Sequence, residues 1–213
     1  QARSGFRAWS ATPVELRAKA LLRAADLLEA RRDEFMALLC REAGKTYDDG
    51  LSEVREAVDF CRYYAAEARR LFGAPQLLHG PTGASNELFL TGRGVSACIS
   101  PWNFPLAIFV GQVAASLAAG NAVVAKPAEA TPLVALEALE LLHRAGVPKD
   151  LLHCLPMSGR AFGEAAMRQP ALAGVVFTGS TATGQWLNRA LAAREGAILP
   201  LIAETGGQNA MIV

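Results

Sequence analysis

The feature that most constrains the fold is an alternation of short apolar runs and helix-length segments after residue 94. The strand-like runs are VSACIS (95–100), AVVAK (122–126), LLHCLP (151–156), GVVFT (174–178) and LPLIAE (199–204). The helical patterns between them cover about 105–119, 131–145, 159–168 and 182–193. Continuous apolar strands joined by helices are typical of a parallel sheet with right-handed crossovers. The sequence therefore predicts an α/β fold in which a ligand lies beyond the carboxyl ends of the strands.

The first part of the chain has a different pattern and carries most of the charge. Residues 13–44 repeat apolar side chains at helical spacing, and Thr12-Pro13 predicts the cap and first position of this helix. A second helix is predicted over about 47–72. A stretch rich in Gly and Pro (73–83) and a short extended segment (86–93) follow it. We expect an exposed helical surface before the sheet begins.

Composition argues against several classes of protein. The net charge of +1 gives no reason to expect nucleic-acid binding. The four cysteines have no paired spacing, which excludes the usual zinc patterns and favours a reducing compartment. Residues 94–125 contain no charged side chain, but their prolines, glycines and asparagines divide them into short elements. We therefore expect buried core there and no membrane span.

The segment VVFTGSTATG places a buried strand directly before the start of a helix. Free backbone N–H groups at a helix start, together with the positive end of the helix dipole, make an anion site. Gly179 would let a phosphate approach the backbone, and the Ser180 hydroxyl would donate to it. The structural alternative is a Ser/Thr cap after a tight turn.

The segment AVVAKPAE ends an apolar strand on a cation. Lys126 at this place is unfavourable unless it is paired or faces a ligand. With Glu129 close by, it would suit the hydroxyl groups of an adenosine ribose, and an acid there favours NAD over NADP. A surface ion pair between Lys126 and Glu129 is the alternative.

The segment ISPWNFP holds Asn103 between two prolines that restrict the backbone. A rigidly aimed side-chain amide is a donor for a developing oxyanion. The alternative is an asparagine that satisfies the backbone of its own turn.

Four segments in this order and separation, ISPWNFP, KPAEATP, FTGSTATG and AETGGQNA, resemble the signature segments of the NAD(P)-dependent aldehyde dehydrogenase superfamily. ETGGQNA and the upstream CREAGKTYDDGLSEVREAVDFCRYYA resemble the L-glutamate γ-semialdehyde (pyrroline-5-carboxylate) dehydrogenase domain of bifunctional proline utilization A. The resemblance implies a parallel-sheet, Rossmann-like NAD-binding domain over 95–207. An amino-terminal helical region (1–85) would pack on it, with an extended excursion over 86–94 and the start of a truncated catalytic domain over 208–213.

The resemblance also implies catalytic roles. Asn103 would form the side-chain half of the oxyanion hole. Glu204 would be the general base that activates water for hydrolysis of a thioester. Phe104 would flank the aliphatic chain of the aldehyde.

Further positions would hold NAD, and no metal site is implied. Lys126 and Glu129 would bind the adenosine ribose, Ser180 the pyrophosphate, and Thr205 and Gly206 would lie near the nicotinamide. The other implied cofactor contacts are Ile99, Ser100, Pro101, Trp102, Ala128, Gly159, Gly163, Phe177, Thr178, Gly179 and Thr183.

The activity implied is NAD-dependent oxidation of L-glutamate γ-semialdehyde to L-glutamate, the second step of proline breakdown. A cysteine nucleophile follows the acid in the family, and none of the four cysteines matches it, so we expect a partial chain that is inactive alone. The complete protein would be a cytoplasmic, multifunctional homo-oligomer, with FAD only in a proline dehydrogenase domain. The alternatives are another aldehyde dehydrogenase, a non-catalytic dinucleotide-binding module, or a helical interaction protein.

Overall fold

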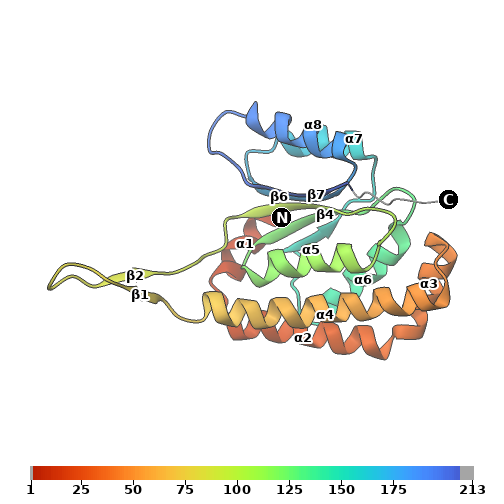
Figure 1. Cartoon of the computed structure of the whole chain (residues 1–213), viewed down its shortest axis with the longest axis horizontal. Coiled ribbons are helices and arrows are strands. Elements are labelled where there is room, and N and C mark those ends of the chain that lie inside the picture. The colour runs from red at the N-terminus through yellow and green to blue at the C-terminus, as the bar shows by residue number, and fades with distance from the viewer. Residues whose placement is uncertain (1, 207–213) are drawn as a thin grey trace, which may run out of the picture.

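A computed structural model describes residues 2–206 as a five-stranded sheet between helices, with a projecting hairpin (Figure 1). The helices are α1 (Ala2–Ser10), α2 (Val14–Ala30), α3 (Arg32–Ala43), α4 (Tyr47–Phe72), α5 (Ala107–Ala118), α6 (Pro132–Arg144), α7 (Gly159–Met167) and α8 (Thr181–Ala192). The strands are β1 (Gln76–Leu78), β2 (Asn86–Leu88), β3 (Val95–Ile99), β4 (Ala122–Lys126), β5 (Leu152–Cys154), β6 (Leu172–Gly179) and β7 (Leu201–Thr205). Within this range, no helix has the length and apolar character needed to cross a bilayer.

The central sheet confirms the predicted α/β fold. Its strands are all parallel, in the order β5-β4-β3-β6-β7. Helices α5 and α6 cover one face, and α7 and α8 cover the other (Figure 1). Ile99 pairs with both Lys126 and Phe177, and Thr178 pairs with Glu204. The polar strand ends therefore meet at one edge of the sheet.

Helices α2, α3 and α4 form a further layer outside α5 and α6. Helix α4 packs on α2 and α5, and α3 packs on α6, so one hydrophobic core joins the two parts of the chain. The single helix predicted over 13–44 is wrong, because the chain breaks at Arg31 (φ −109°, ψ 21°). There the Arg31 guanidinium reaches Glu137 of α6 at 2.7 Å. The predicted Thr12 cap is also wrong, since its hydroxyl donates to Ala8 O instead.

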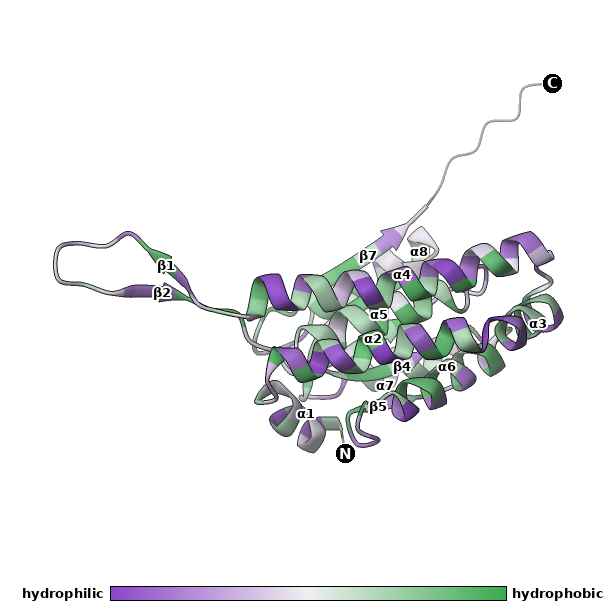
Figure 2. Cartoon of the chain, turned by 90° about the horizontal axis from the view of Figure 1, so that it is seen from below, coloured by the Kyte–Doolittle hydropathy of each residue, from purple (hydrophilic) through white to green (hydrophobic). Residues whose placement is uncertain are grey.

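The sequence did not predict α1 or the first strand of the hairpin. Helix α1 lies against β3 and β4, and the Trp9 indole donates to Leu117 O of α5 at 2.9 Å. Strand β1 pairs antiparallel with β2, which lies inside the extended segment expected over 86–93. This hairpin projects from the body (Figure 2) and joins residues on both sides of the expected boundary at 85/86.

Two carboxylates from the amino-terminal helices cap the helices that cover the sheet. Glu42 of α3 accepts from Leu133 N and Val134 N, at 2.7 and 2.8 Å, at the start of α6. Glu53 of α4 accepts from Leu106 N and Ala107 N, at 2.8 and 3.3 Å, at the start of α5. Free N–H groups at a helix start are thus satisfied across the interface between layers.

The α6 cap gives a first prediction. Glu42→Ala should lower the free energy of unfolding by about 1–2 kcal/mol, because two backbone donors lose a charged acceptor. Urea denaturation followed by circular dichroism measures the change. Asp33→Ala, which removes an exposed ion pair with Arg32, is the matched control and should change stability by less than about 0.5 kcal/mol. Equal losses in both variants would contradict the capping role.

Candidate functional site

A cleft of about 630 Å³ opens at the carboxyl edge of the sheet. It is formed by the ends of four strands and the loops that follow them, together with the starts of α7 and α8. Its lining residues are Ile99, Ser100, Pro101, Trp102, Asn103, Lys126, Ala128, Glu129, Gly159, Phe177, Thr178, Gly179, Ser180, Thr183, Glu204, Thr205 and Gly206. Each of these was a predicted site position. The structure therefore brings together residues that are up to about a hundred positions apart in the chain.

Two predicted positions lie outside this lining. Gly163 lies under Trp186 of α8, and a Cβ added to it would be 2.8 Å from the indole ring. The glycine thus allows α7 and α8 to approach closely. Phe104 turns toward the amino-terminal layer, where the Lys45 ammonium lies 4.0 Å from its ring centroid. Their proposed contacts with NAD and with the aldehyde stay predictions.

Lys126 is a buried cation in the cleft. It is 6% exposed, and its ammonium has no hydrogen bond or ion pair to any residue of the described range 2–206. The Glu129 carboxylate instead accepts from Gly159 N at 2.8 Å, so the alternative of a surface ion pair is wrong. Burial lowers the pKa of Lys126, and the charge of Glu129 partly opposes this shift. A buried ammonium of this kind is stabilised by oxygen atoms of a ligand.

For the start of α8, the sequence left open an anion site and a Ser/Thr cap. Ser180 Oγ accepts from Thr183 N at 3.2 Å and donates to Thr183 Oγ1 at 2.9 Å, so the residue is an N-cap. This cap satisfies one backbone N–H of the first turn, and Ser180 and Thr183 both line the cleft. A Cβ added at Gly179 would lie 2.7 Å from the Phe177 ring, so the glycine makes room for that ring. Binding of an anion at this turn stays a prediction.

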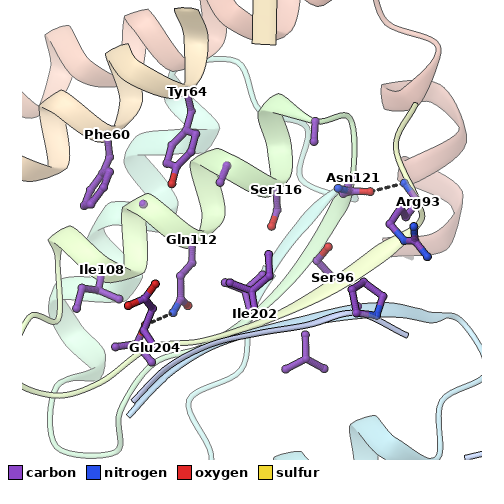
Figure 3. Close-up of a pocket in the computed structure, with 18 of the residues that line it drawn as sticks. Phe60, Tyr64, Arg93, Ser96, Ile108, Gln112, Ser116, Asn121, Ile202 and Glu204 are labelled. Atoms are coloured by element: carbon purple, nitrogen blue, oxygen red, sulfur yellow. Dashed lines mark hydrogen bonds between the residues drawn. The ribbon is translucent and has the colours of Figure 1, made fainter. Parts of the chain in front are cut away.

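The Asn103 amide and the Glu204 carboxylate have no hydrogen bond or ion pair to another residue of the range 2–206. The Asn103 side chain is exposed and has no hydrogen bond within residues 2–206, so it does not serve its own turn there. Glu204 on β7 lines the cleft and also a second cavity of about 600 Å³ (Figure 3). In Figure 3 the Tyr64 hydroxyl and the Glu204 carboxylate both point into this second cavity. Burial, with the charges of Tyr63 and Glu204, raises the pKa of Tyr64.

Gln112 is a site residue that the sequence did not predict. It is 7% exposed, and its side-chain nitrogen donates to Ile99 O at 3.2 Å and to Thr178 Oγ1 at 3.0 Å. It thus joins the ends of β3 and β6, which carry the cleft. The one available signal was a lone amide in the otherwise apolar helix AIFVGQVAASLA.

The four cysteines all lie outside the cleft lining. Burial raises the pKa of Cys61, Cys98 and Cys154 to about 12. A reactive thiol needs a low pKa, so the buried Cys61 and Cys98 and the partly buried Cys154 are small packing side chains rather than nucleophiles.

The family model described as "Aldehyde dehydrogenase family" matches residues 1–213. The chain belongs to the aldehyde dehydrogenase family. Among similar proteins, "Bifunctional protein PutA" of Klebsiella aerogenes is 49% identical over 208 residues, which are 96% of this chain and 15% of that protein. The chain therefore spans about a seventh of the length of this curated relative.

Two solved structures have the same fold. A crystal structure of a mutant of Bradyrhizobium japonicum proline utilization A (PutA) is 61% identical, with a TM-score of 0.94 over 97% of this chain and 21% of that one. A 1-pyrroline-5-carboxylate dehydrogenase from Thermus with bound NAD is 36% identical, with a TM-score of 0.92 over 97% and 41%. Both confirm the Rossmann-like architecture of this aldehyde dehydrogenase chain.

The thiol environments give a second prediction. At pH 8 only about one in ten thousand molecules has a thiolate at a cysteine of pKa about 12, so Cys61, Cys98 and Cys154 should resist iodoacetamide. Mass spectrometry of the folded protein should find them unmodified, whereas urea-unfolded protein should be labelled at all three. Rapid labelling of Cys98 in the folded protein would show that its thiol is accessible and ionised.

Proposed function

We propose that this chain supplies the NAD-binding cleft, the oxyanion donor and the general base of an NAD-dependent L-glutamate γ-semialdehyde dehydrogenase. The observation that carries the proposal is the cleft itself, which gathers Asn103, Glu204 and the Lys126–Glu129 turn at one edge of the sheet. The names of the similar proteins, PutA and 1-pyrroline-5-carboxylate dehydrogenase, support this aldehyde and a role in proline catabolism.

The residues of the cleft fit a dinucleotide. Lys126 has a buried ammonium with no partner in the described residues, and it would donate to ribose oxygens. Glu129 is held by Gly159 N with its second oxygen available for a ribose hydroxyl, which favours NAD over NADP. The backbone at the start of α8 would face the pyrophosphate. NAD bound here would accept the hydride that leaves the aldehyde carbon.

The chain's own residues would support an acyl-transfer reaction. The Asn103 amide would donate to the oxygen of the aldehyde as negative charge develops there, an interaction worth roughly 3 kcal/mol in comparable sites. Glu204 would take a proton from water, which then attacks the thioester carbon and releases the acid. The cysteine thiolate that forms the thioester would come from a part of the complete enzyme not included in these residues.

The second cavity supports a route for the aldehyde. Glu204 borders both cavities, so a substrate in the second cavity would reach the same carboxylate as the cofactor in the cleft (Figure 3). Phe60, Tyr64 and Ile108 give this cavity an apolar wall that suits an aliphatic chain. The wider expectations, a cytoplasmic homo-oligomer with FAD confined to a proline dehydrogenase domain, remain predictions.

NAD binding tests the cofactor half of the proposal. Lys126→Met in the complete enzyme should weaken NAD binding about tenfold, because a charge-assisted donor to the ribose is lost. Isothermal titration calorimetry measures the dissociation constant. Lys149→Met, at an exposed turn outside the cleft, is the matched control and should bind NAD normally. Binding that is equal in both variants, or absent in the unmodified protein, would contradict the assignment and favour a helical interaction protein.

Glu204→Gln tests the general base. Hydrolysis of the thioester should slow by about a hundredfold, with a smaller effect on hydride transfer, because the amide cannot accept a proton from water. Rapid-quench kinetics should then show a larger burst of NADH relative to the steady state. Glu195→Gln, at an exposed position after α8, is the control. A burst ratio that Glu204→Gln leaves unchanged would remove Glu204 from this role.

A further inference from the structure

The loop between β3 and α5 carries Asn103 into the cleft. The Asn103 side chain has no hydrogen bond to residues 2–206, so no hydrogen bond within them fixes its direction. An amide that stabilises a developing charge must nevertheless be aimed before the reaction begins. Its orientation then depends on how firmly the loop backbone is held.

Besides the Ile108 N–Phe104 O hydrogen bond to its own helix, this loop has contacts with other elements at its start, middle and end. At its start, Ser100 N donates to Lys126 O at 3.1 Å. At its end, Leu106 N donates to Glu53 Oε1 at 2.8 Å. In the middle, the Phe104 ring, next to Asn103 in the chain, lies under the Lys45 ammonium at 4.0 Å. The contacts of Phe104 and Leu106 are thus made by residues of the amino-terminal region, Lys45 and Glu53.

These two outside contacts are coupled to each other. Glu53 is 1% exposed, and its second carboxylate oxygen lies 3.1 Å from Lys45 Nζ. A buried carboxylate is destabilising unless it is paired and hydrogen-bonded, so Lys45 compensates the charge that the loop end requires. One ammonium therefore holds Phe104 through its ring and the loop end through Glu53.

The Glu42 cap on α6 can be compared with the Glu53 cap on α5. Glu42 also accepts from two backbone N–H groups at a helix start. Within the described residues, however, it has no cation partner, and no ammonium joins it to a side chain of the preceding loop. A cap alone would serve stability. The additional link from Lys45 to the residue beside Asn103 points to the site.

We propose that Lys45 and Glu53 are positioning residues that hold the Asn103 amide in its productive direction. Neither side chain lines the cleft, so they act through the loop rather than on the substrate or NAD. The inference rests on the proposed function and extends it to the second layer of helices. Misplacement of a catalytic group by about 1 Å lowers turnover by up to about a hundredfold.

A double-mutant cycle in the complete enzyme tests this inference. Lys45→Met should lower kcat for L-glutamate γ-semialdehyde about tenfold or more, with the NAD dissociation constant unchanged. In the Asn103→Ala background the same substitution should cause less than a twofold further loss, because the amide that it misplaces is already absent. Lys45→Arg, which keeps a cation for Glu53 and Phe104, should retain most of the activity.

The matched control is Arg69→Met. It removes another cation that pairs between helices, with Glu15 at 3.0 Å, away from the cleft. Its kcat should stay within twofold of the unmodified enzyme. Thermal melting of every variant separates loss of folded protein from loss of turnover. If Lys45→Met does not fold, Glu53→Gln takes its place in the double-mutant cycle.

One result would contradict only the positioning role, and another would contradict the proposed function as well. An equal loss from Lys45→Met with and without Asn103 would show that the pair stabilises the fold generally, and the positioning role would be wrong. Full activity of Asn103→Ala, or no turnover by the unmodified enzyme, would overturn the proposed function and this inference with it.

Discussion

Backbone N–H groups at the start of a helix need acceptors, and at α5 and α6 side chains from another layer provide them. Glu42 and Glu53, on α3 and α4, bond the first turns of α6 and α5. Each capped helix follows a loop that lines the cleft, one with Lys126 and Glu129 and the other with Asn103. The positions of these loops therefore depend on helices α3 and α4, although no residue of these two helices lines the cleft.

This constraint explains why the amino-terminal helices share a core with the sheet. Apolar side chains of α2 and α4 form one cluster with those of α5, β3 and β4. A layer that only covered the sheet would need apolar contact alone. Here the carboxylates of Glu42 and Glu53 at the same interface also set the register between layers, because a displaced carboxylate would lose its backbone hydrogen bonds. Packing and site geometry thus depend on the same contacts.

The predicted features are those that depend on local sequence. The strands and helices after residue 94 lie within about two residues of their predicted bounds, because a buried parallel strand is a continuous apolar run. Helix α1 was missed because its short, mixed segment gains stability only from contacts such as Trp9 with Leu117. The break at Arg31 was missed because Glu137, more than a hundred positions away, is its partner.

The sequence by itself determined the parallel sheet, the polar residues at its strand ends and the family to which they belong. These follow from apolar periodicity and from motifs whose residues are close together in the chain. Only the tertiary structure decided that Lys126 is buried without forming an ion pair with Glu129, that Glu204 lies between two cavities, and that Gln112 joins two strand ends. Such facts depend on the distances between side chains far apart in the chain, which packing sets and local pattern does not encode.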